Sequence, residues 1–139
     1  MFHTVIIVGN VGRDPEMRYT PSGQAVTSFS VATSRTYTNS QGTAVKETVW
    51  FRITTWGKTA EACSQYLHKG NKVFIEGRLQ PDLQSGAPRV FQRKDGTWSA
   101  SYEISASTVR FLSSRTETTA SGEEAPEAAG EEVVDDIPF

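Results

Sequence analysis

The stretch from Thr48 to Lys58, TVWFRITTWGK, constrains the fold more than any other part of this 139-residue chain. Successive side chains of a β-strand point to opposite faces, so alternate residues form two separate sets. One set suits a core and contains Val49, Phe51, Ile53 and Thr55. The other set mixes rings, hydroxyls and a cation, and contains Trp50, Arg52, Thr54 and Trp56. The pattern predicts a strand with one buried face and one face free for another role.

Further strands are predicted on both sides of this one, with a single helix between them. β-branched or alternating segments predict strands over residues 3–11, 25–37, 71–79 and 101–112. Helical spacing of apolar residues predicts a helix over 58–70, with Gly70 as a left-handed C-terminal cap. In the long connection 80–98, the Asp95-Gly96 pair predicts a hairpin turn.

Three strands, a helix and two more strands follow one another in the order of the OB-fold, a five-stranded Greek-key barrel. We therefore expect an all-β fold with one helix, a long β-hairpin arm and a disordered acidic C-terminal tail. A small β-sandwich with an incidental helix fits the same order. We expect two parts, an OB-fold domain over 1–112 and a tail over 113–139 that is too polar to bury a core.

The charges are divided between these two parts. Residues 1–115 carry all 14 Lys and Arg against 8 Asp and Glu, a net charge of +6, whereas residues 116–139 carry 8 carboxylates and no base. A basic body indicates a polyanionic ligand. No apolar run has the length of a membrane span, and no basic segment precedes the first strand as in a signal peptide, so we expect a cytoplasmic protein without a membrane partner.

The mixed face of the 48–58 strand suits single-stranded nucleic acid. Bases stack on aromatic rings at about 1–3 kcal/mol each, while cations hold the phosphates. Packing of Trp50 and Trp56 against a second sheet or subunit is the alternative, but Arg52 between them favours a ligand. Tyr37 beside Arg35, and Phe91 and Trp98 in the arm, are further stacking candidates. The two rings of the arm could instead cover the end of the barrel.

Basic residues of the body are candidates for phosphate contacts. They are Arg35, Arg52, Lys58, Lys69, Lys72 and Arg78. Each lysine, and Arg78, is by itself interpreted first as a solvated charge. A body of net charge +6 nevertheless favours several contacts with phosphates. No set of residues indicates catalysis, because His3 and His68 lack metal-ligand neighbours at useful spacing and Cys63 is a single cysteine. We expect no enzyme activity, no metal and no cofactor.

The segment DDIPF differs from the acidic run before it. Two carboxylates followed by two apolar anchors look like a peptide ligand for a hydrophobic pocket with a basic rim. The residues expected to bind partner proteins are Asp135, Asp136, Ile137, Pro138 and Phe139.

Three segments together closely resemble the bacterial single-stranded DNA-binding protein family. They are VIIVGNVGRDPEMRYTPSGQAVTSFSVATS (5–34), TVWFRITTWGKTAEACSQYLHKGNKVFIEGRLQ (48–80) and DDIPF (135–139). The resemblance implies an OB-fold homotetramer that binds and protects single-stranded DNA, largely independently of its sequence, in replication, recombination and repair. It implies a location in the cytoplasm, on the nucleoid, and recruitment of replication and repair proteins through the DDIPF segment.

The resemblance also implies roles for individual residues. It implies that bases stack on Tyr37, Trp50 and Trp56. It also implies that phosphates are contacted near Arg52, Lys58 and Lys69. After the segment GRLQ, some family members carry a stacking tryptophan where this chain has Leu83 and Gln84. Phe91 or Trp98 is the expected substitute. An OB-fold adaptor that chiefly binds protein, such as a primosome component, and a nuclease are the alternative functions.

Overall fold

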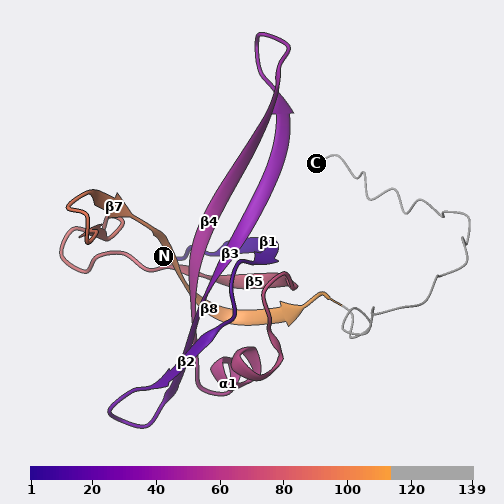
Figure 1. Cartoon of the computed structure of the whole chain (residues 1–139). Coiled ribbons are helices and arrows are strands. Elements are labelled where there is room, and N and C mark those ends of the chain that lie inside the picture. Colours follow the sequence, from indigo (N-terminus) through magenta and orange to yellow (C-terminus); the bar gives the residue numbers. More distant parts are fainter. Residues whose placement is uncertain (114–139) are drawn as a thin grey trace, which may run out of the picture.

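The computed structural model describes residues 1–113, whose arrangement is shown in Figure 1. Within these residues the elements are β1 (Val5–Val11), β2 (Glu16–Tyr19), β3 (Ala25–Thr38), β4 (Ala44–Trp56), α1 (Gly57–Tyr66), β5 (Lys72–Leu79), β6 (Val90–Gln92), β7 (Trp98–Ala100) and β8 (Tyr102–Phe111). The predicted order of strands, helix and arm is confirmed. No helix in this part of the chain is long and apolar enough to cross a membrane.

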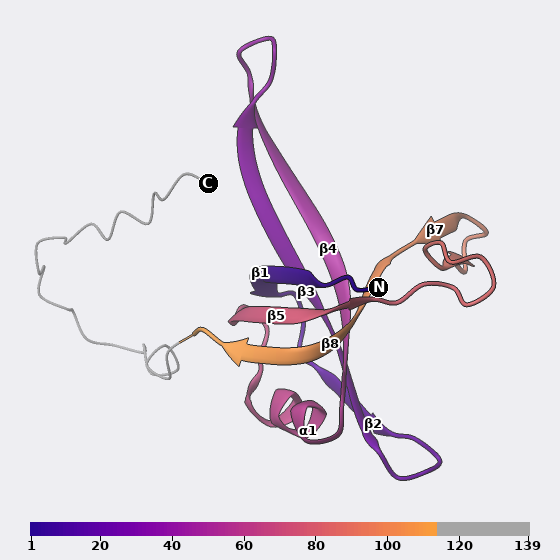
Figure 2. The same ribbon diagram turned by 180° about the vertical axis from the view of Figure 1, so that it is seen from behind.

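Five strands close into a barrel. The hydrogen-bonded order is β1-β5-β8-β4-β3, and β1 returns to β3 through Asn10 and Val11. All neighbours are antiparallel except β4 and β8, which run parallel. Figure 2, seen from behind, shows β1, β5 and β8 side by side below the rising β3–β4 hairpin. The barrel confirms the predicted OB-fold.

One strand was not predicted from the sequence. The turn at residues 12–15 separates β1 from β2, and both pair with β3. All four side chains of β2 are exposed. An exposed strand lacks the apolar alternation on which sequence prediction depends, because neither of its faces is buried.

The core lies inside the barrel, where alternate residues of the strands meet. Its innermost side chains are at most 4% exposed and include Ile7, Phe29, Val31, Ile53, Val73, Ile75 and Ile104. The inward direction predicted for Ile53 and Thr55 is confirmed, since both are fully buried. Phe51 is half-buried and packs against the edge of this cluster.

Helix α1 covers one end of the barrel (Figure 1). Its Cys63 and the following Leu67 enter the core, and the Thr27 hydroxyl donates a hydrogen bond of 2.7 Å to the carbonyl of Ala60. The helix ends at Tyr66, earlier than predicted. Leu67 adopts an extended conformation, and Gly70, at φ +91°, serves the turn into β5 and is not the helix cap. The helix therefore stops before the extended residue Leu67, whose backbone N–H donates to the carbonyl of Cys63 and whose side chain is buried in the core.

Two ribbons project from the barrel. The outer halves of β3 and β4 rise well beyond it, and the arm of residues 80–101, which carries β6 and β7, extends to one side (Figure 1). These projections place residues from distant parts of the sequence around one face of the barrel.

Candidate nucleic-acid interface

The outer face of β3 and β4 holds the rings singled out in the sequence. Cross-strand partners share a face, and Trp50 lies opposite Ala32, Arg52 opposite Ser30, and Trp56 opposite Val26. The small neighbours Ser30 and Ala32 on β3 leave the longer side chains of Arg52 and Trp50 uncovered, and Trp50 is 55% exposed. Trp56, beside the buried Val26, is 40% exposed. The interpretation of these tryptophans as surface residues is consistent with this geometry.

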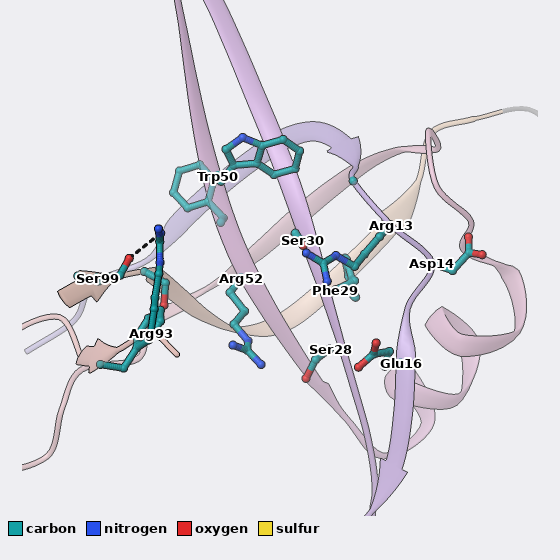
Figure 3. Close-up of a pocket in the computed structure, with 15 residues that line it drawn as sticks. Arg13, Asp14, Glu16, Ser28, Phe29, Ser30, Trp50, Arg52, Arg93 and Ser99 are labelled. Carbon is teal, nitrogen blue, oxygen red and sulfur yellow. Dashed lines mark hydrogen bonds between the residues drawn. The ribbon is translucent and has the colours of Figure 1, made fainter. Parts of the chain in front are cut away.

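A groove of about 510 Å³ opens on this face (Figure 3). Four stretches of chain line it: residues 12–16 after β1, the middle of β3, the middle of β4, and the arm. Trp50 and Arg52 form part of the lining, whereas Trp56 shares their face beyond the groove. The groove brings together residues that are distant in the sequence.

Three arginines from three separate segments reach the groove. They are Arg13 from the turn after β1, Arg52 from β4 and Arg93 from the arm (Figure 3). The sequence pattern indicated Arg52, and Arg93 only as one of several cations in a basic arm that could wrap a DNA strand, whereas it assigned no role to Arg13. Arg13 and Arg93 lie in a turn and beside a turn, where no periodicity indicates which way a side chain faces.

Two carboxylates also line the groove, Asp14 and Glu16. The Asp14 carboxylate accepts a hydrogen bond of 2.9 Å from the backbone N–H of Lys69. Asp14 therefore ties the turn after β1 to the loop after α1. The cations outnumber the carboxylates in the lining by three to two, which favours an anionic ligand.

Trp50 is held in place by Gly12. A Cβ atom on Gly12 would lie 2.4 Å from Cζ3 and 2.9 Å from Cη2 of the indole ring. The Gly12 backbone N–H donates a 2.9 Å hydrogen bond to the carbonyl of Ser30, which fixes the backbone beneath the ring. Gly12 is not among the residues with positive φ, so packing against the ring, and not backbone conformation, explains the glycine.

The arm separates the two rings that the sequence left as alternatives. Phe91 lines the groove together with Trp50, and Trp98 does not. In the β6–β7 pairing, Phe91 lies opposite Ser99 and Gln92 opposite Trp98, so the two rings point to opposite faces of the arm. Of the two rings, Phe91 is the one that lies in the groove with Trp50, and the stacking role of each ring stays a prediction.

Tyr37 lies away from the groove. It pairs with Val45 near the tip of the hairpin and occupies the opposite face of the β3–β4 ribbon from Trp50. The Arg35 guanidinium stands 5.2 Å from the centre of the Tyr37 ring and forms a 2.7 Å ion pair with Glu47. The hydrogen bond and charge of Glu47 raise the pKa of Arg35. The structure does not bring Tyr37 and Arg35 together with Trp50.

The remaining phosphate-contact candidates surround the barrel at separate positions. Lys58 lies in the first turn of α1, Lys69 lies in the loop after the helix, and Lys72 and Arg78 lie near the two ends of β5. All four are exposed, and none belongs to the lining of the groove. Their roles stay predictions. The partner-binding segment 135–139 lies outside the described residues.

The described residues contain no cluster of His, Cys, Asp or Glu that could hold a metal ion. Cys63 is buried, and burial raises the pKa of its thiol to about 11, a shift that a hydrogen bond with Thr55 partly offsets. A thiol with this pKa is protonated at neutral pH, so Cys63 acts as a core side chain.

A model of the single-strand binding protein family matches residues 2–112. Two curated proteins named single-stranded DNA-binding protein, from Neisseria meningitidis serogroups A and B, are each 44% identical over 115 residues. These alignments cover 83% of this chain and 62% of the relatives, so the chain spans less than two thirds of their length. Single-stranded DNA-binding protein 1 of Chlorobaculum tepidum is 53% identical over 76 residues, 55% of this chain and 47% of that protein.

Solved structures show the same fold. A deletion mutant of the single-stranded DNA binding protein from Thermus aquaticus has a TM-score of 0.62 at 26% identity, over 81% of this chain and 51% of that one. A complex of Plasmodium falciparum SSB with ssDNA has a TM-score of 0.67 at 23% identity, over 81% of this chain and 97% of that one. Because the family model covers most of the sequence, the chain belongs to the single-strand binding protein family.

Proposed function

We propose that this protein binds single-stranded DNA largely independently of sequence and catalyses no reaction. One observation carries the proposal: exposed Trp50, Arg52 and Trp56 share a face of the barrel. The groove on this face is also lined by Arg13 and Arg93, which come from two other segments of the chain. Flat rings stack on bases of any kind, and guanidinium groups hold the phosphates. Duplex DNA hides its base faces, so this surface favours a single strand.

The proposal assigns a role to each part of the chain. Residues 1–112 form the DNA-binding domain, and four copies assemble into a homotetramer that protects single strands in replication, recombination and repair. The tail over 113–139 recruits replication and repair proteins through Asp135–Phe139, and the protein acts in the cytoplasm, on the nucleoid. The family match and the quoted sequence segments support these roles.

Titration of the full chain with oligothymidine tests the binding, with tryptophan fluorescence as the signal. Stacking on Trp50 and Trp56 is expected to quench the emission at low salt. Affinity for a single strand falls with salt by about 0.7 log units per log unit of salt for each phosphate contact. A lack of quenching at low salt would contradict the proposal.

The groove arginines are tested by the salt dependence of binding. Arg93→Ala and Arg13→Ala are each expected to reduce the slope by about 0.7, because each removes one phosphate contact. Arg110→Ala is the matched control, since Arg110 is exposed on β8 and lies outside the groove lining. Equal slopes for all three variants would show that the groove does not hold the phosphates.

Light scattering of the free protein tests the homotetramer, and a smaller particle contradicts it.

Deletion of residues 135–139 tests the tail. The truncated protein is expected to keep its affinity for oligothymidine and to lose replication and repair proteins in a pull-down. Partners retained after the deletion would place the protein-binding surface on the barrel, as expected of an adaptor.

A further inference from the structure

The segment between β1 and β2 carries a cation of the groove, Arg13, on a stretch of backbone with few ties. Its two ends are fixed, because the Gly12 N–H donates its 2.9 Å hydrogen bond to the Ser30 carbonyl and β2 begins to pair with β3 at Glu16. Among the described residues, no backbone hydrogen bond joins residues 13–15 to the rest of the barrel. The position of the exposed Arg13 therefore depends on what else holds this stretch.

One side chain ties residues 13–15 to the barrel. The Asp14 carboxylate accepts the 2.9 Å hydrogen bond from the backbone N–H of Lys69, a residue 55 positions later in the sequence. Figure 3 shows Asp14 at the edge of the groove nearest the helix and away from Trp50. Within residues 1–113 the Asp14 side chain makes no other hydrogen bond. This contact is therefore the link between the Arg13 segment and the loop after α1.

The donor of this hydrogen bond is itself held firmly. The next residue, Gly70, donates a 2.8 Å hydrogen bond from its N–H to the carbonyl of Val11, and its own carbonyl accepts a 3.1 Å hydrogen bond from the Asn10 side chain. Two residues before Lys69, the Leu67 side chain is buried in the core. The Lys69 N–H is therefore a fixed point of the barrel against which Asp14 can hold the flanking residues.

The charge of Asp14 works against the proposed ligand. Asp14 and Glu16 both line the groove, and within residues 1–113 no cationic side chain forms an ion pair with either. Two unit charges about 8 Å apart in water repel enough to weaken binding about twofold at low salt. The Glu16 side chain makes no hydrogen bond among the described residues, so only Asp14 combines this electrostatic cost with a tie to the barrel.

We propose that Asp14 is a positioning residue of the groove: its hydrogen bond to the Lys69 backbone holds residues 13–15 in place and so presents Arg13 to a phosphate. The inference rests on the proposed function of the groove. The acceptor oxygen of Asp14 is the useful part of the side chain, and the negative charge is a disadvantage. Asparagine keeps an acceptor oxygen without the charge, and alanine keeps neither.

Titration of full-length variants with oligothymidine over a range of salt separates the acceptor from the charge. Asp14→Asn should raise the affinity about twofold at low salt, and so should the matched control Glu16→Gln, because each removes one repelling charge. Asp14→Ala should have the opposite effect. Loss of the Arg13 contact should reduce the salt slope by about 0.7, which corresponds to an affinity about three- to fivefold lower at about 0.1 M salt.

A double-mutant cycle tests whether Asp14 acts through Arg13. In the Arg13→Ala background, Asp14→Ala should not reduce the slope further, because the cation that Asp14 positions is already absent. In the Arg93→Ala background it should reduce the slope as it does in the wild-type protein, because Arg93 belongs to the arm and is not held by Asp14.

Three results would overturn the inference. Equal affinities for Asp14→Asn and Asp14→Ala would show that Asp14 acts only through its charge. A slope that still falls in the Arg13→Ala background would show that Asp14 does not act through Arg13. A large loss of stability of Asp14→Ala in urea denaturation would show that Asp14 supports the whole barrel, whereas an exposed positioning residue should change it little. Failure of the wild-type protein to bind oligothymidine would instead contradict the proposed function.

Discussion

The half of β4 that lies in the barrel and the half that lies in the projecting hairpin differ in how their two faces are buried, although they belong to one strand. Within the barrel, Ile53 is fully buried while its neighbours Arg52 and Thr54 are not, so the two faces are sharply divided. Beyond the barrel no core lies under the strand, and Val45, Glu47 and Val49 are only partly buried. The alternation of a strand therefore distinguishes core from surface only where the strand is part of the closed barrel.

The largest effect is expected at the buried face. Ile53→Ala should reduce the free energy of unfolding by about 2–5 kcal/mol, because it leaves a cavity in a close-packed core. Urea denaturation measures the change. A small loss of stability would mean that the division between the faces of β4 is weaker than the burial of Ile53 indicates.

Trp50→Ala tests the opposite face of the same strand. It should weaken the binding free energy for oligothymidine by about 1–3 kcal/mol, because one stacking surface is lost, and should change stability much less than Ile53→Ala. Fluorescence anisotropy with a labelled oligonucleotide and urea denaturation measure the two effects. Intact affinity together with a large loss of stability would identify Trp50 as a packing residue.

Gly12→Ala tests whether the position of the Trp50 ring affects the affinity for DNA. The new Cβ cannot coexist with an indole at 2.4 Å, and the Gly12 backbone is held by Ser30, so the ring must move. The affinity loss should approach that of Trp50→Ala. In a double-mutant cycle, Gly12→Ala should have no further effect once Trp50 is alanine. Additive losses would show that Gly12 acts independently of the ring.

The smallest effect is expected in the outer half of the hairpin. Tyr37→Ala should leave the affinity for a strand of about 8 nucleotides almost unchanged, because Tyr37 lies on the other face of the ribbon and away from the groove. The same anisotropy assay measures it. A loss as large as that of Trp50→Ala would show that the hairpin bends over the groove when DNA binds.

Much of the barrel could be predicted because apolar and polar residues alternate along strands that have one buried face. Ile53 and Trp50 were assigned to opposite faces by alternation alone, and the order of the elements indicated the OB-fold. The same alternation could have placed Tyr37, since it lies an even number of residues after Phe29 and Val31 and continues their side of β3. Tyr37 was selected for its place beside Arg35 at the end of a strand, and its stacking role stays a prediction.

The groove itself could not be predicted from the sequence. Arg13 and Arg93 reach it through a turn and an arm, and their convergence on Arg52 depends on barrel closure and on the path of the arm. Gly12 shows the same limit, because its partner is the ring of Trp50 on another strand. Local patterns carry no information about such long-range contacts.

The parallel pairing of β4 with β8 has a consequence for folding kinetics. It joins Phe51 to Tyr102, and the barrel also needs β1 to meet β5, so most of its closure depends on contacts between distant parts of the chain. Such contacts form slowly, whereas the β3–β4 hairpin is local and can form early. The groove requires the turn after β1, the hairpin and the arm together, so it exists only after closure. A single strand added during refolding would therefore report the last step and not the first.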